Sequence, residues 1–184
     1  MMAKRVSVVI LCEDLQHEVF LRAVLLHQQF NIRHMRIVRR EPGDAKQFVV
    51  NHFPAEVQTL RRHRREHRIL IVMTDADDRS VNERLKTLTN ALAIANVDPI
   101  KANDPVFCFV PKWEIETWLA YLDGKTVQED RKYPKLVRES DAQPLVKRLM
   151  KMCNDQRLRR GAPPSLAIAC DLYRRMVTCF RRAR

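Results

Sequence analysis

Acidic side chains gather directly after three apolar runs of the chain. Eight of the 22 acidic residues lie there: Glu13, Asp14, Glu18, Asp75, Asp77, Asp78, Glu114 and Glu116. Like charges that meet in one place repel each other unless a cation joins them. An Asp-x-Asp pair such as Asp75 and Asp77, joined by a neighbouring carboxylate such as Glu13, offers only oxygen ligands. Such a set suits Mg²⁺ or Mn²⁺ and does not suit zinc.

Three apolar runs rich in β-branched residues must position these acids. Residues 5–12, 67–74 and 106–110 are typical of strands buried on both faces, and a shorter strand is expected at 33–38. In a parallel α/β sheet the carboxyl ends of the strands meet at one edge, where ligands bind. Because acids follow each of the three runs, we expect Glu13, Asp75 and either Glu114 or Glu116 to lie together at that edge.

Helical patterns alternate with the strands. Four helices are expected before residue 123, at 15–30, 45–65, 80–95 and 115–122. Pro54 is expected to interrupt the second helix, because proline lacks the backbone N–H that a helix interior uses. Ser80 and Glu83 have the spacing of a capping box at the start of the third helix.

The alternation of strands and helices predicts the fold class. We expect an α/β domain over residues 1–123, with a mostly parallel sheet and helices on both faces. Residues 124–184 are expected to form a basic helical extension packed on this domain, with helices at 142–153 and 165–182.

The charge of the chain points to a polyanionic partner. There are 34 basic and 22 acidic residues, so the net charge is +12. Arginine binds phosphate through paired hydrogen bonds. We therefore expect a nucleic acid as partner, contacted by these arginines: Arg39, Arg40, Arg61, Arg62, Arg64 and Arg65. The alternative is a solvated basic surface. An anionic membrane is not expected, since the basic runs lack Trp or Phe on an opposing face.

Glycine and cysteine usage excludes several classes of site. The chain has three glycines and neither a G-x-G-x-x-G nor a G-x-x-x-x-G-K motif, so the usual nucleotide-binding loops are absent. Five widely spaced cysteines without a Cys-x-x-Cys motif predict neither a zinc site nor a disulfide framework, and Cys12 and Cys108 are expected in the core. No apolar run approaches the ~18 residues of a membrane span, and no signal-peptide cleavage site is evident. These features predict a cytoplasmic protein.

Three segments resemble motifs of the TOPRIM (topoisomerase–primase) domain. VVILCEDLQHEVFLRAVL resembles the first motif of that family, a hydrophobic strand, a Glu and a helix with Phe seven residues after the Glu. ILIVMTDADD resembles its Asp-x-Asp motif. FCFVPKWEIETWL is similar to a P-x-x-E-x-E-x-W segment of small stand-alone TOPRIM proteins and OLD-type nucleases. The resemblance covers residues 5–122.

The resemblance implies a TOPRIM-like fold and a Mg²⁺- or Mn²⁺-dependent nuclease acting on DNA or RNA, often encoded beside an ATPase in anti-phage defence modules. By motif, Glu13 is an acid/base or metal residue, and Asp75 and Asp77 are metal ligands. The residues expected at the catalytic site are Glu13, Asp75, Asp77, Glu116 and Lys112. The residues expected to bind metal are Glu13, Asp75, Asp77 and Glu18.

Two positions depart from the family pattern. Asp14 stands where a Gly often follows the first Glu, and His17 stands where OLD-type members place an acid. Either Glu18 replaces that acid, or the site binds one metal instead of two. His17 is expected to be a proton shuttle, a phosphate contact or a polar residue on a helix face.

Structural alternatives accompany these functional assignments. Glu18 also fits a first-turn acid favoured by the helix dipole, and Lys112 fits a surface lysine as well as one that neutralises a phosphate. Two other functions fit the same residues. One is a non-catalytic nucleic-acid-binding subunit. The other is a receiver-like phosphoacceptor domain, which would need a Lys after a further strand. A homodimer is an alternative to a monomer.

Overall fold

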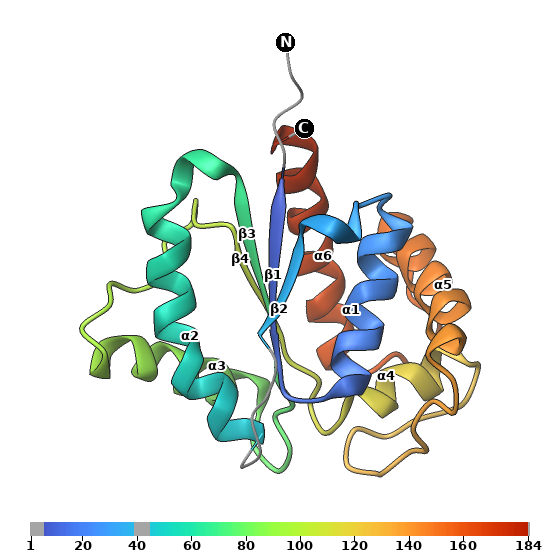
Figure 1. Ribbon diagram of the computed structural model, residues 1–184. Helices are drawn as coiled ribbons and strands as arrows, with labels where there is room; N and C mark the ends of the chain where they lie inside the picture. Colours follow the sequence, from blue (N-terminus) through green and yellow to red (C-terminus); the bar gives the residue numbers. More distant parts are fainter. Residues whose placement is uncertain (1–5, 39–44, 184) are drawn as a thin grey trace.

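The computed structural model describes residues 6–38 and 45–183 and has an α/β fold built on one four-stranded sheet (Figure 1). The strands are β1 (Ser7–Cys12), β2 (Met35–Val38), β3 (Arg68–Met73) and β4 (Val106–Phe109). Their order is β2-β1-β3-β4, and every neighbouring pair is parallel. The expected mostly parallel sheet is confirmed, and it is parallel throughout.

Helices cover both faces of the sheet, as expected (Figure 1). One face carries α1 (Leu15–His27), α4 (Ile115–Leu122), α5 (Ala142–Asn154) and α6 (Pro164–Ala183). The other face carries α2 (Ala45–Arg62) and α3 (Val81–Ile94). Short 3-10 turns lie at Ile32–His34, Arg64–Glu66 and Glu139–Asp141.

The two hydrophobic cores explain why β1 and β3 are apolar at every position after their first residue. Successive side chains of a strand point to opposite faces. In β3, Ile69, Ile71 and Met73 therefore pack toward α1 and α4–α6, while Leu70 and Val72 pack toward α2 and α3. A strand that is buried on both faces cannot alternate between apolar and polar residues. Its continuous apolar run is the pattern that predicted a buried strand.

The helix starts that frame the sheet edge are fixed by side-chain caps. The Asp14 carboxylate accepts a hydrogen bond from the His17 backbone N–H at 3.0 Å and begins α1. Ser80 and Glu83 form the expected capping box and begin α3. Both caps hold the first turn of a helix beside the carboxyl end of a strand.

Helix α2 runs through Pro54 without a break, so the expected interruption there is wrong. The neighbouring side chains of Phe53 and Val57 are almost completely buried in the core between α2, α3 and the sheet. Burying this apolar face stabilises the helix by more than the missing proline N–H and the ring clash destabilise it.

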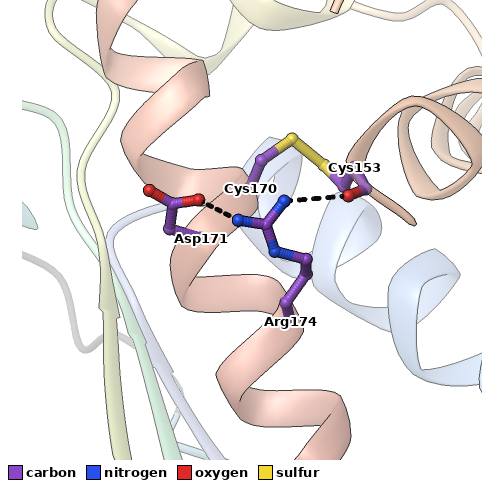
Figure 2. The surroundings of a disulfide bond; sticks show 4 residues. All are labelled: Cys153, Cys170, Asp171 and Arg174. Carbon is purple, nitrogen blue, oxygen red and sulfur yellow. Dashed lines mark hydrogen bonds and ion pairs between the residues drawn. A yellow bond between two sulfur atoms is a disulfide. The ribbon is translucent and has the colours of Figure 1, made fainter. Parts of the chain in front are cut away.

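Cys153 at the end of α5 and Cys170 in α6 form a disulfide (Figure 2), which corrects the expectation of no disulfide framework. Their Cα atoms lie 5.0 Å apart. Beside it, Arg174 donates a hydrogen bond to the Cys153 carbonyl oxygen at 3.2 Å and forms an ion pair with Asp171 (Figure 2). The packing of two helices brings these distant cysteines together, and their spacing in the chain carries no sign of it.

The C-terminal helices share a hydrophobic core with the sheet. Helix α5 packs on α1, and α6 packs on β4. Polar contacts add to this packing, since Trp118 Nε1 donates to Ser165 Oγ at 2.8 Å and the Tyr121 hydroxyl donates to the Arg159 carbonyl at 2.7 Å. Within the described ranges, no helix combines the length and the hydropathy that crossing a membrane requires.

Candidate metal centre

The carboxyl ends of β1 and β3 bring Glu13 and Asp75 together. These strands are adjacent, with Cys12 paired to Met73, so the residues that follow them meet at the lower edge of the sheet in Figure 1. Glu13 is 5% exposed and Asp75 is 8% exposed. The Thr74 hydroxyl and the Asp75 backbone N–H, at 3.4 Å, both donate to the Glu13 carboxylate. Burial raises the pKa of Glu13, although the hydrogen bond from Thr74 opposes that rise.

His17 completes this group from the first turn of α1. Its side chain is fully buried, and Nε2 shares a hydrogen bond with Asp75 Oδ1 at 3.0 Å. Burial alone would lower the pKa of His17, but the charge of Asp75 and the hydrogen bond to it raise the pKa to about 9. On the other side of the ring, Nδ1 lies 3.8 Å from Asp14 Oδ1. This separation is too long for a hydrogen bond, and Nδ1 has no hydrogen-bond partner among the described residues.

Glu13, His17 and Asp75 each offer one ligand atom, and these three atoms lie within 4.8 Å of one another. Two carboxylates and an imidazole at this separation can share a divalent cation. His17 occupies the position where the resemblance would have placed an acid, so the predicted all-oxygen set has a nitrogen as its third member.

Glu116 adds a buried carboxylate in the first turn of α4. It is 3% exposed, and its Oε1 has no hydrogen-bond partner. Burial raises the pKa of Glu116, and the negative charges of Asp75 and Asp14 raise it further, so this carboxyl lies within their electrostatic reach. A buried polar atom without a partner is costly. A cation and its bound water would satisfy both this oxygen and the surrounding negative charge.

Arg84 is a residue of the centre that sequence reasoning missed. Its side chain is buried, Nε donates to the Asp75 carbonyl oxygen at 2.7 Å, and Nη2 donates to Asp77 Oδ2 at 3.1 Å. Nη2 also lies 4.0 Å from Glu13 Oε1. One feature of the sequence could have predicted that Arg84 is buried. The capping box fixes the start of α3, and Arg84 then shares a helix face with the buried Leu88 and Leu92.

Asp77, Lys112 and Glu18 were predicted site residues, and the structure places them around the Glu13–His17–Asp75 group. Asp77 has a left-handed backbone, with φ of 55°, and its carboxylate is bonded to Arg84. Lys112 Nζ donates to the carbonyl oxygens of Asp77 at 3.1 Å and Arg79 at 2.6 Å, so it fastens the loop after β3. Glu18 forms an ion pair with Arg22, one turn further along α1, at 3.1 Å.

Three of the arginines predicted to bind nucleic acid, Arg61, Arg62 and Arg64, lie at the other end of the sheet. Arg61 is committed to structural contacts, with hydrogen bonds to Asp104 and to the carbonyl oxygens of Asp98 and Pro99. Arg64 also pairs with Asp104, at 3.2 Å. Arg62 is exposed. Arg39, Arg40 and the side chain of Arg65 lie outside the described residues.

Two lysines from the segment between α4 and α5 lie near the acids instead. Lys135 Nζ is 3.7 Å from Asp14 Oδ2, and Lys132 Nζ is 3.9 Å from Glu114 Oε1. Both side chains are largely exposed. They give the rim of the acidic centre a positive charge.

Comparison of the chain with protein-family models, with curated proteins and with solved structures finds no match in any of the three.

Proposed function

We propose that the protein is a divalent-metal-dependent nuclease that hydrolyses phosphodiester bonds of DNA or RNA. The observation that carries this proposal is the buried Glu13–His17–Asp75 group at the carboxyl ends of two adjacent parallel strands. Mg²⁺ or Mn²⁺ fits the two carboxylates, and the imidazole favours Mn²⁺. The resemblance of the surrounding motifs to the TOPRIM domain supports the same reaction class.

The chain's own residues have separable roles in this reaction. Glu13, His17 and Asp75 would hold the ion, which when bound would activate water and neutralise charge on the phosphate. The hydrogen bonds from Thr74 and the Asp75 N–H fix the direction of the Glu13 carboxylate. Glu116, whose Oε1 has no hydrogen-bond partner, would accept the proton that hydrolysis releases.

Substrate binding rests on cations near the centre. Lys132 and Lys135 present exposed ammonium groups beside the acids, where a phosphate backbone could contact them. Arg62 and Arg64 lie at the opposite edge, separated by the six-residue strand β3, or about 20 Å at ~3.3 Å per residue. They would contact only a substrate long enough to span the sheet. We further propose, on the resemblance, an ATPase partner in anti-phage defence, and, on the sequence features given above, a cytoplasmic protein.

The test is a cleavage assay with plasmid, single-stranded DNA and tRNA in Mg²⁺, Mn²⁺ or EDTA, with the full chain alone and together with any ATPase encoded beside it. We expect cleavage that requires metal and is lost in Asp75→Asn. Asp98→Asn is the matched control, because Asp98 is an exposed aspartate whose side chain pairs with Lys101. Binding that persists in EDTA without cleavage under any condition would favour a non-catalytic nucleic-acid-binding subunit.

A further inference from the structure

We propose that this centre holds a single divalent ion and that the guanidinium of Arg84 takes the place of a second one. The inference rests on the proposed metal-dependent function, because it concerns the same group of residues. It deepens that function by assigning the number of ions and the role of Arg84.

The acidic side chains divide into two sets by their partners. Glu13, His17 and Asp75 offer ligand atoms within 4.8 Å of one another. Asp77 is bonded to Arg84 Nη2 at 3.1 Å and is not a member of that group. The second aspartate of the Asp-x-Asp motif therefore faces a fixed organic cation.

The position of Arg84 is fixed by more than its ion pair. Its Nε donates to the Asp75 carbonyl oxygen at 2.7 Å, so the guanidinium is anchored to the backbone of a ligand residue. The side chain is 6% exposed, and arginine keeps its charge at any pH at which the protein folds. A buried charge of this kind is tolerated only with partners, which here are Asp77 and Glu13.

A second ion between Glu13 and Asp77 would have to displace this guanidinium. In two-metal sites the ions stand ~3.5–4 Å apart and neutralise charge on both sides of the phosphate. Arg84 Nη2 lies 4.0 Å from Glu13 Oε1 and 3.1 Å from Asp77 Oδ2. The guanidinium therefore brings one positive charge to these two carboxylates without a second ion. Arg84 is thus a positioning residue that sets the loop after β3 and balances the charge of Glu13 and Asp77.

The experiment counts Mn²⁺ bound per chain by isothermal titration calorimetry, with electron paramagnetic resonance to report any coupled pair of ions. Wild type is expected to bind one Mn²⁺. Asp75→Asn should lose at least about tenfold in affinity, whereas Asp77→Asn should still bind one ion with a loss below about tenfold. Arg84→Gln should bind a second ion, because it removes the cation between Asp77 and Glu13, whereas Lys86→Gln, an exposed cation on the same helix, should still bind one.

Two Mn²⁺ ions on wild type would overturn the inference and leave the proposed nuclease intact. Loss of the ion in Asp77→Asn would also overturn it, and this variant decides the matter even where Arg84→Gln fails to fold. A folded Arg84→Gln that still binds one ion would contradict the role given to Arg84. Wild type that binds no Mn²⁺ and cleaves nothing would remove both the inference and the proposed function.

Discussion

His17 gives the buried group a nitrogen donor between two carboxylates. Its Nε2 faces Asp75 at 3.0 Å, and its Nδ1 lies 3.8 Å from Asp14. Imidazole binds first-row transition-metal ions such as Mn²⁺ in preference to Mg²⁺, whereas carboxylates accept both Mg²⁺ and Mn²⁺. In the proposed metal site, His17 would therefore decide which of the two ions is preferred.

Replacing that nitrogen should change metal preference. We expect His17→Gln to lower Mn²⁺ affinity by at least about tenfold and Mg²⁺ affinity by less. Titration calorimetry with each ion measures both affinities. His27→Gln is the control, since His27 is an exposed histidine on the same helix. An unchanged ratio of the two affinities would remove His17 from the ligand set.

Glu116 provides a prediction about stability in the absence of metal. Burial raises the pKa of Glu116, so the folded protein binds its proton more tightly than the unfolded chain does. Its charge therefore destabilises the folded state as pH rises above ~4.3, the usual value of a glutamate. In EDTA at pH 7, Glu116→Gln should raise the free energy of unfolding by about 1 kcal/mol, because glutamine keeps the size of the side chain and removes its buried charge.

The pH dependence of the gain in unfolding free energy tests whether the charge of Glu116 causes it. Below pH ~3 both states carry a protonated Glu116, so wild type and Glu116→Gln should unfold at the same denaturant concentration. Urea unfolding at several pH values measures the difference. A gain that stays constant from pH ~3 to pH 7 would mean that packing, and not charge, separates the two proteins.

At the scale of elements, the strands and the acids that follow them could be predicted because they are local patterns. The apolar runs predicted the strands β1, β3 and β4. Parallel pairing of β1 and β3 then places Glu13 next to Asp75. The hydrogen bonds of Asp75 with His17 and Arg84 were not predicted, although the capping box of α3 carried a signal for Arg84. His17 reaches Asp75 only because the Asp14 cap sets the start of α1, and Arg84 reaches the site only through the packing of α3.

The link between α5 and α6 is another contact between elements that no local pattern predicts. A disulfide that closes a loop of 17 residues should stabilise the protein by about 3 kcal/mol, mainly by restricting the unfolded chain. We expect Cys153→Ala combined with Cys170→Ala to lower the free energy of unfolding by that order, measured in urea. A reducing agent should lower the free energy of unfolding of wild type to a similar extent and leave that of the double variant unchanged. Equal stability of wild type with and without reductant would contradict a formed disulfide.

On the scale of the whole molecule, charge is divided between the two ends of the sheet. The buried acids lie at the carboxyl ends of the strands, rimmed by Lys132 and Lys135, while Arg61 and Arg64 are paired with Asp104 at the other end. The chain as a whole carries a net charge of +12, although these acids gather at one end of the sheet. Such a net charge would draw a polyanion to the surface.

The lysines of the rim provide a prediction about nucleic-acid binding. Lys132→Glu with Lys135→Glu should weaken binding to duplex DNA and reduce its salt slope by about 0.9 for each phosphate that the variant no longer neutralises. Fluorescence anisotropy at several salt concentrations measures the slope. Arg62→Glu with Arg64→Glu is the comparison at the far edge, and it should matter only for duplexes long enough to span the sheet. Equal effects of both pairs on a short duplex would contradict a substrate path over the acidic centre.

The decisive measurement is the rate of nucleic-acid cleavage by the full chain as Mn²⁺ is titrated, with Asp75→Asn measured alongside. We predict no cleavage in EDTA, a rate that rises and saturates with Mn²⁺ for wild type, and no rise for Asp75→Asn. A rate that is independent of Mn²⁺ and Mg²⁺, or that is the same in Asp75→Asn, would contradict a nuclease whose metal is held by Glu13, His17 and Asp75.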